Sequence, residues 1–382
     1  MPRNRIIYQS EALYAGPAPA TGFHYGTFTP GIGGSTNVPE ANTNLVNQLQ
    51  RIQTANYSFN VERTDVNQYG QLAAIDRVIL NSPTVSLDFS YLLGNLSNDN
   101  ILGLTIVSGN SDSTISAISG FLNKTSDERN YFIRTTPEGT DTVGFTSNSS
   151  GDNGVIGIGN GTITSYSTEG SVGNFPTTTI NVEGLNMNFQ KGISGNLVPA
   201  VNPVNGSPLQ NYYQLSQATQ NVGLGSGNAI SALRPGDITL SLTNTLASGV
   251  DVSTMNIQSY TLSLDLGRTP IQRLGNKFAF TREIDFPLTV SLSVEAQVTE
   301  MNAGNLATLV ADDSATLTPS ITIKSPTDSS LIMAKFLLKG AKLDSQEYST
   351  DIGSNKSVTL TFSSQIGGPQ DTSNGLFING QF

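Results

Sequence analysis

The chain has no cysteine and no tryptophan, and it has one histidine in 382 residues. Without cysteine there can be neither a disulfide framework nor a thiolate metal site. A Ser-His-Asp device could be built only around the single histidine, His24. That residue lies in a Gly- and Pro-rich stretch, which is a poor platform for a general base, so we expect no catalysis from it.

Charge is also scarce, at 13% of residues, and the net charge is −10. A protein that binds nucleic acid tightly would have a positive net charge. A negative net charge does not exclude a protein that lets DNA slide past without binding it. No apolar run approaches the roughly 18 residues that span a bilayer. The N-terminal stretch lacks the apolar core of about 7–15 residues that a signal peptide has. We therefore expect no membrane segment and no leader.

Few motifs suggest chemistry. The stretch Gly154–Gly161 (GVIGIGNG) lacks the Gly-Lys-Ser/Thr ending of a phosphate loop and precedes a strand-like segment, so we interpret it as a tight turn. The adjacent acids Asp127-Glu128 and Asp312-Asp313 are interpreted as solvated pairs, and nothing resembles an EF-hand loop. The sequence thus predicts no enzyme, no cofactor and no metal.

What the chain does contain is two-residue alternation. Four stretches alternate apolar and polar side chains most clearly: Tyr57–Glu62, Thr84–Tyr91, Tyr260–Leu266 and Thr289–Ala296. Such strands form antiparallel sheets with one face on the core and one face in water. Further strands are predicted at Ala74–Leu80, Val155–Ser167, Thr177–Leu185, Asp237–Leu242, Ser320–Ile323, Ile332–Leu338 and Ser357–Ser363. Short helices are predicted at Asp112–Asn123 and Asn305–Ala311.

A diverged repeat organises the sequence. The tetrapeptide Thr-Val-Ser-Leu occurs at 84–87 and at 289–292, an offset of 205 that Gly70 shares with Gly275 and Arg77 shares with Arg282. Before the glycine the best identities give an offset of 203, which places Tyr57 against Tyr260 and Glu62 against Asp265. This shift predicts a two-residue insertion near Pro270. Later matches, such as Val182 with Phe362, have an offset of 180. The repeat is too long for a solenoid unit, so we predict a tandem duplication of one β-domain.

These observations divide the chain into five parts. We expect an N-terminal arm at 1–44, a first domain at 45–190, a connector at 191–235, a second domain at 236–370 and a Gly-rich C-terminal tail at 371–382. Residues 124–153 are expected to form an insertion or long loop in the first copy. The arm is either a disordered tail or an extended segment laid on a neighbouring subunit.

The order of elements resembles that of the tail tube proteins of long-tailed bacteriophages. The likeness is carried by PTVSLDF, SYSTEGSVGNFPTTTINVEGLNM, QRLGNKFAFTREIDFP and GAKLDSQEYSTDIGSNKSVTLTFSSQIGG, and it covers most of residues 45–370. The resemblance implies a mainly β fold: two tandem tail-tube-type barrel or sandwich domains, each with a short flanking helix.

The resemblance also implies a function. Six such domains form a ring, and rings stack into a tube through which the genome passes; with two domains per chain, a trimer with pseudo-sixfold symmetry suffices. The implied partners are further copies of the chain, other tail proteins (a baseplate hub, a terminator or a sheath) and genomic DNA that passes without specific binding. The protein would be made in the host cytoplasm and act in the virion. The alternatives are a baseplate hub or tail-end ring protein with two tube-like domains, and a surface or carbohydrate-binding β-protein.

The polar rows of the alternating strands are the candidate channel lining. Small hydroxyl groups and carboxylates there would repel phosphate and offer few donors to hold it. The alternative is that these rows face bulk solvent outside a ring. The candidates are Glu62, Asp88, Asp265, Glu295, Ser58, Asn60, Ser86, Ser263, Ser291 and Ser293.

Overall fold

The computed structural model describes residues 11–17, 46–122, 127–136, 141–142, 154–191, 215, 233–241, 255–272, 274–275, 279, 281–298, 316–350, 355–368 and 371–382. The described chain is mainly β-strand, as expected from the alternation. Among these residues no helix is long and apolar enough to cross a membrane.

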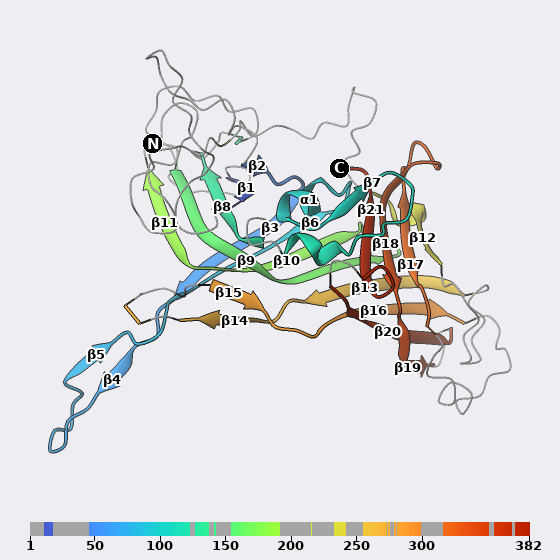
Figure 1. The fold of residues 1–382 in the computed structure, drawn as a ribbon. Helices are drawn as coiled ribbons and strands as arrows, with labels where there is room; N and C mark the ends of the chain where they lie inside the picture. Colours follow the sequence, from blue (N-terminus) through green and yellow to red (C-terminus); the bar gives the residue numbers. More distant parts are fainter. Residues whose placement is uncertain are drawn as a thin grey trace, which may run out of the picture.

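One continuous sheet runs through both copies of the repeat (Figure 1). Eight of its strands follow one another in the order β19-β20-β16-β13-β9-β10-β6-β3, and each neighbouring pair is antiparallel. Half of them come from each copy, so the two repeats form one surface. The strands are β3 (Ile52–Asn60), β6 (Thr84–Leu92), β9 (Gly154–Ser171), β10 (Thr177–Gly184), β13 (Asn256–Asp265), β16 (Leu288–Gln297), β19 (Lys342–Ser349) and β20 (Ser357–Ile366).

A second layer covers the first copy. The long strand β9 pairs through its first half with β8 (Arg129–Thr135) and β11 (Asn186–Lys191), and β8 pairs in turn with β1 (Glu11–Pro17). The short strand β2 (Asn47–Gln48) lies beside β1. The ring centroids of Phe89 on β6 and Tyr131 on β8 are 6.3 Å apart, so this layer packs on the apolar row of the sheet.

A five-stranded sheet covers the second copy. Its order is β12 (Ile238–Ser241), β17 (Ser320–Lys324), β18 (Ile332–Lys339), β21 (Gly375–Gly380) and β7 (Ile106–Ser108). Phe336 and Ile378 of this sheet are buried in the same core as Leu292 and Phe362 of the long sheet. The expectation of a Gly-rich tail is wrong for β21, because all six of its residues are buried between β18 and β7.

Other elements are short. Hairpins β4–β5 (Thr64–Val66, Asp76–Val78) and β14–β15 (Arg268–Ile271, Thr281–Ile284) leave corresponding ends of the two copies. Among the described elements the helices are α1 (Ser97–Leu102) and the 3-10 turns Ala117–Gly120 and Pro235–Asp237.

Two local predictions for the first copy are wrong. The helix expected at 112–123 is limited to the 3-10 turn, because the Ser113 hydroxyl accepts the Ile115 amide at 3.2 Å and holds a turn there. Ile115 and Leu122 are exposed, so they form no buried stripe. The loop expected at 124–153 contains β8, six of whose seven residues are buried.

The strand pairing corrects the repeat alignment. Ser58 lies opposite Ser86, and Ser263 lies opposite Ser291. Both pairs are related by an offset of 205, not 203. Even the β-bulges coincide, at 52/54 in β3 and at 257/259 in β13. Tyr57 therefore corresponds to Leu262, Glu62 does not correspond to Asp265, and there is no insertion near Pro270.

The predicted apolar rows form the core. Val85, Leu87, Phe89 and Tyr91 are all at most 2% exposed, and so are their second-copy counterparts at 290, 292, 294 and 296. Both copies place this row between two layers, which is a β-sandwich arrangement. Within the described ranges no sheet closes on itself into a barrel.

Candidate assembly interface

The two copies join edge to edge in the long sheet. Strand β13 pairs antiparallel with the second half of β9, so that Leu264 lies opposite Tyr166 and Leu262 opposite Thr168. Strand β9 ends the first copy in sheet order, and β13 begins the second. The junction is therefore head to tail, since it joins two different edges of the repeated unit.

The same two edges are open at the ends of the sheet. In the described part of the chain, β3, the counterpart of β13, pairs with β6 alone, and β19, the counterpart of β9, pairs with β20 alone. An edge strand presents unpaired amide and carbonyl groups that can bind another chain. One molecule thus has, at the two ends of its sheet, the same two edges that pair with each other at the internal β9–β13 junction.

Burial distinguishes the formed junction from the open edges. Tyr260, Leu262 and Leu264 on β13 are at most 3% exposed. Phe59 on β3, the counterpart of Leu264, is 59% exposed. Tyr348 on β19 is 40% exposed, although its counterpart Thr168 is fully buried. The open edges therefore expose side chains whose equivalents the neighbouring repeat covers.

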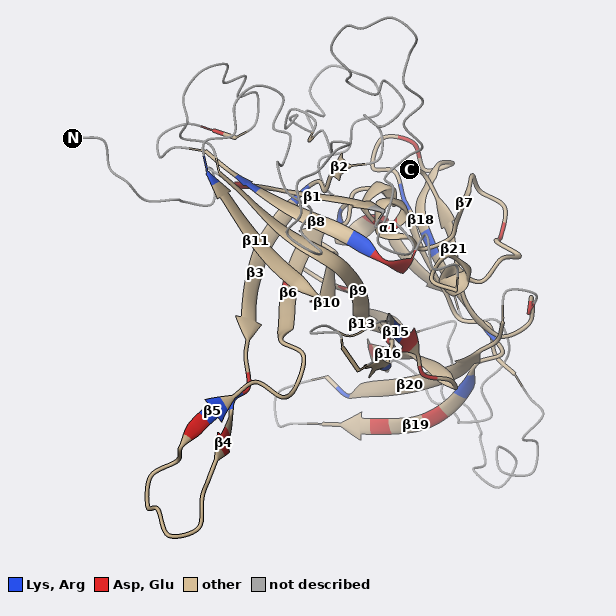
Figure 2. Cartoon of the chain, turned by 60° about the vertical axis from the view of Figure 1, so that its left-hand side comes forward, with Lys and Arg blue, Asp and Glu red and all other residues tan. Residues whose placement is uncertain are grey.

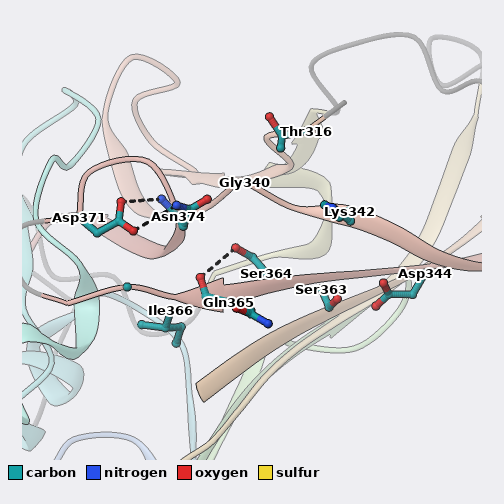
Figure 3. A pocket seen from close by; sticks show the side chains of 11 residues that line it. Thr316, Gly340, Lys342, Asp344, Ser363, Ser364, Gln365, Ile366, Asp371 and Asn374 are labelled. Atoms are coloured by element: carbon teal, nitrogen blue, oxygen red, sulfur yellow. Dashed lines mark hydrogen bonds between the residues drawn. The ribbon is translucent and has the colours of Figure 1, made fainter. Parts of the chain in front are cut away.

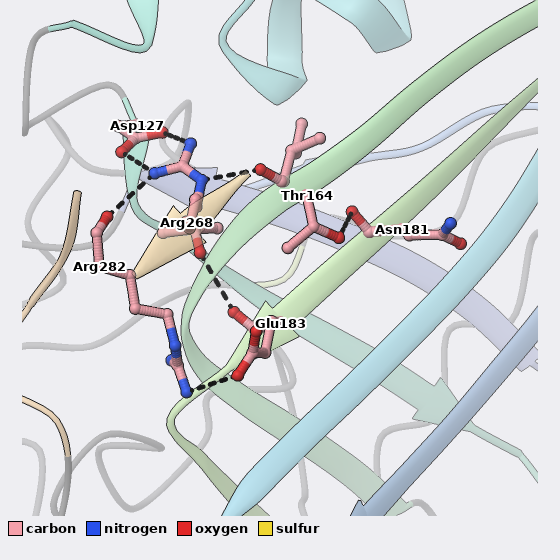
Figure 4. Close-up of polar contacts among 8 residues, drawn as sticks. Asp127, Thr164, Asn181, Glu183, Arg268 and Arg282 are labelled. Carbon is pink, nitrogen blue, oxygen red and sulfur yellow. Dashed lines mark hydrogen bonds and ion pairs between the residues drawn. The ribbon is translucent and has the colours of Figure 1, made fainter. Parts of the chain in front are cut away.

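Hairpin β14–β15 stabilises the internal junction through an ion pair. Arg268 donates from both terminal nitrogens to the two carboxylate oxygens of Asp127, at 2.7 and 2.6 Å, and from Nε to the Ile163 carbonyl at 2.9 Å (Figure 4). The Arg268 side chain is 1% exposed. Burial raises the pKa of Asp127, opposed by the hydrogen bond and charge of Arg268. The interpretation of Asp127 and Glu128 as solvated acids is wrong, because both are buried.

A second arginine on the hairpin binds β10. Arg282 Nη2 lies 2.9 Å from Glu183 Oε1, and its side chain is 3% exposed (Figure 4). Burial lowers the pKa of Arg282, while the charge of Glu183 raises it. Arg268 and Arg282 together hold the second copy against the first.

The corresponding hairpin of the first copy is free of such docking. Figure 2 shows β4–β5 projecting away from both layers. By the 205 offset its arginines Arg63 and Arg77 correspond to Arg268 and Arg282, and both are exposed. Arg77 binds Asp65 of its own hairpin at 2.6 Å. At the tip, Tyr69 and Leu72 are fully exposed.

The outer face of the long sheet is a ladder of small polar groups. Cross-strand side-chain hydrogen bonds join Ser58 to Ser86 at 2.8 Å and Ser263 to Ser291 at 2.7 Å. Asn56 donates to Asp88 at 3.1 Å. Such pairs are expected where the opposite face is packed in the core.

The candidate channel residues are placed by this sheet. Nine of them lie on the polar side of the alternating strands, and Glu62 lies just beyond the end of β3, exposed. The nine are Ser58, Asn60, Ser86, Asp88, Ser263, Asp265, Ser291, Ser293 and Glu295. The structure thus gathers them on one face, and Asn60 takes the position that corresponds to Asp265.

Charge on the eight strands is strongly one-sided. Within their bounds the sequence has seven acidic residues and a single basic residue, Lys342. The acids are Asp88, Glu169, Glu183, Asp265, Glu295, Asp344 and Glu347. Glu183 is paired with Arg282, and the acids that remain outnumber Lys342, so the strands would repel an anionic polymer lying along them.

A buried carboxyl fixes α1 on the core. Asp99 is fully buried and accepts hydrogen bonds from Tyr91 Oη at 2.9 Å and Tyr166 Oη at 2.8 Å. Burial raises the pKa of Asp99, opposed by these two bonds and by the charge of Arg51. The sequence alone gave no sign of this network, because Tyr166 lies 67 residues from Asp99.

Of the remaining candidate motifs, one lies within the described residues and two lie outside them. The stretch Gly154–Gly161 is the start of strand β9 and not a turn. His24 and Asp312-Asp313 lie outside the described residues. No group of three or more potential metal ligands occurs in the part of the chain that is described.

Comparison with known proteins adds little. No protein-family model matches the sequence, and no curated protein matches it. Among solved structures, similarity is found to a chain of the anti-feeding prophage (AFP) baseplate, determined by cryo-EM and 6-fold symmetrised. The identity is 18%, the TM-score is 0.24, and the match covers 37% of this chain and 91% of that chain. A TM-score this low carries no argument, so function is inferred from the geometry of the chain itself.

Proposed function

We propose that this chain is a structural subunit of a phage tail tube, in which three copies close into a ring of six repeats and rings stack around a DNA channel. The β9–β13 junction carries the proposal. A head-to-tail contact between repeats leaves the same two edges open at the ends of each chain, and a repeated heterologous contact makes either a ring or a filament.

The register of the contact between chains follows from the internal one. Ser263 lies opposite Ser167 at the β9–β13 junction. The offsets of 205 and 180 convert this pair into Ser58 on β3 of one chain and Glu347 on β19 of the next. The same conversion brings Phe59 opposite Gln346 and Tyr57 opposite Tyr348, which would cover the exposed apolar groups of both edges.

The polar face supports the role of a channel. In a ring whose sandwich layers lie outside, the polar face of the long sheet, with its excess of acidic residues, would line the inside. Serine and threonine hydroxyls already bonded across strands leave few donors for phosphate, and the carboxylates repel it. Such a lining lets DNA pass without binding it.

The hairpins support stacking. Leu274 at the tip of β14–β15 is as fully exposed as Tyr69 and Leu72 at the tip of β4–β5. Apolar side chains at exposed hairpin tips are suited to contact a second ring rather than water.

Cysteine cross-linking tests the ring, since the chain has no cysteine of its own. Ser58→Cys with Glu347→Cys in one chain is expected to give disulfide-linked dimers and trimers, with the circular trimer as the largest product. Ser167→Cys with Ser263→Cys is the matched control and is expected to link within one chain. Ser58→Cys with Lys342→Cys, five residues out of register, is expected to link poorly.

The outcomes separate the alternatives. A formed control with no Ser58–Glu347 link, or a ladder that extends far beyond three chains, contradicts the closed trimer. Electron microscopy of the uncross-linked protein then distinguishes long tubes from the single rings of a baseplate hub or tail-end protein. Monomers at high concentration would favour a surface-binding β-protein.

A further inference from the structure

We propose that a pocket on the second copy is the docking site for hairpin β4–β5 of the next chain, with Arg63 as its anchoring cation. The inference rests on the proposed ring, because it concerns the contact that accompanies β3–β19 pairing. Its starting point is that the second hairpin, β14–β15, is already seen docked at the corresponding place on the first copy.

The pocket occupies the position that corresponds to this docking site. Its volume is about 480 Å³, far above the roughly 30 Å³ of one water molecule. It is lined by the start of β19, the end of β20 and the nearby residues Thr316, Gly340, Gly367, Asp371 and Asn374. Six of its lining residues have first-copy counterparts by the offset of 180. They are Lys342, Asp344, Ser363, Ser364, Gln365 and Ile366, which correspond to residues 162, 164, 183, 184, 185 and 186.

The docked hairpin shows where an arginine would enter. In the first copy Arg268 Nε binds the carbonyl of Ile163, the residue before the bulge at Thr164. The second copy has the same bulge, with Leu343 and Asp344 at these positions. Arg63, which corresponds to Arg268, would therefore approach the Leu343 carbonyl with a carboxylate beside it.

The charge of the pocket suits one cation. Figure 3 shows Asp344 and Asp371 on opposite sides of the pocket, which Lys342 also lines. Two carboxylates and one ammonium leave a net charge of −1. Asp371 accepts bonds from the Ser373 and Asn374 amides, which lower its pKa, so it is ionised at neutral pH.

Arg63 and Arg77 differ in the contacts that they make within one chain. Arg63 is exposed, and no described residue makes a hydrogen bond or ion pair with it. Arg77 already binds Asp65, a position held by Pro270 in the docked hairpin. The acceptor of Arg282, Glu183, corresponds to the uncharged Ser363. Arg63 is thus the anchor, and Arg77 is its matched control.

Charge reversal tests the contact on the full chain, with ring assembly measured against subunit concentration by light scattering and microscopy. Arg63→Glu and Asp344→Arg are each expected to raise the concentration for half-assembly by roughly tenfold or more, as for a charge pair buried in an interface. The double reversal is expected to restore most of the loss. Arg77→Glu is expected to change it by less than about threefold, as at an exposed rim.

Two results overturn the inference in distinguishable ways. If Arg63→Glu assembles like the unaltered protein while the Ser58–Glu347 cross-link still forms, the hairpin does not dock there but the ring stands. If that cross-link fails in the otherwise unaltered chain, both proposals fail together. Because Arg63 is exposed, its variant is expected to keep the unfolding midpoint of the monomer, so weaker assembly cannot be ascribed to misfolding.

Discussion

The ion pair between Arg268 and Asp127 gives the sharpest test of how the two copies are held together. Truncating Arg268 to alanine removes two short bonds to the carboxylate and the donors to the Ile163 and Arg282 carbonyls. The Asp127 side chain, 11% exposed, is then left with a charge that water barely reaches. Breaking a buried pair from one side costs about 3–5 kcal/mol.

Urea unfolding followed by circular dichroism measures this cost. With a slope of about 3 kcal/mol/M, the midpoint of Arg268→Ala is expected to fall by about 1–1.7 M. Arg63→Ala, the same change at the corresponding exposed position, is expected to stay within about 0.5 kcal/mol of the unaltered protein. Asp127→Ala is expected to cost less in the Arg268→Ala background than alone, because the uncompensated charge is removed.

The reasoning is refuted if Arg268→Ala loses less than about 1 kcal/mol, or no more than Arg63→Ala. Additive effects of Arg268→Ala and Asp127→Ala would also refute it, since they would show two independent sites.

Two further predictions concern the first copy. Because the pKa of Asp99 is raised in the folded state, its protonation stabilises the fold; that contribution is present below the unfolded value and lost as pH rises through the folded one. The unaltered protein should therefore gain stability relative to Asp99→Asn as pH falls toward about 4, and a relative loss in urea titrations would contradict this. Tyr14→Ala is expected to cost about 3–5 kcal/mol, because Tyr14 is fully buried and its hydroxyl binds Arg134; a loss below about 1 kcal/mol would contradict it.

The burial of Tyr14 also changes the expectation for the N-terminal arm. Strand β1 pairs along its whole length with β8 of the same chain and buries Leu13, Tyr14 and Ala15. Deleting residues 1–30 would therefore remove part of the first-copy core. The truncated subunit itself is therefore expected to be less stable, since β1 packs within the same chain.

Sequence reasoning identified the duplication and the two-faced strands because both leave strong local marks. It placed β6, β10, β13, β16 and β20 within a few residues. It misaligned the start of the repeat by two residues for a physical reason. A shift of two preserves which side chains face the core, so alternation cannot detect it, and the chance likeness of Tyr57 to Tyr260 decided the alignment. The hydrogen-bonding register settles it.

The elements that were missed lack periodicity. Strand β21 is buried on both faces, so its sequence shows no alternation. It begins and ends with glycine, which in a sequence suggests a loop; both glycines, Gly375 and Gly380, have positive φ angles. Helix α1 has six residues and no side-chain cap. Arg268 and Asp127 are 141 residues apart, and no local pattern could join them.

The duplication has a consequence for the kinetics of assembly. In a ring of six repeats made from three chains, every second junction is covalently prearranged, so its effective concentration does not depend on how much protein the cell has made. Three chains then come together in two encounters between molecules, against five for six separate subunits, so less translational freedom is lost in forming the ring. The junction within a chain and the junction between chains can also differ in their residues. The internal one can use Asp127 and Glu183, while the external one evolves its own acceptors on β19.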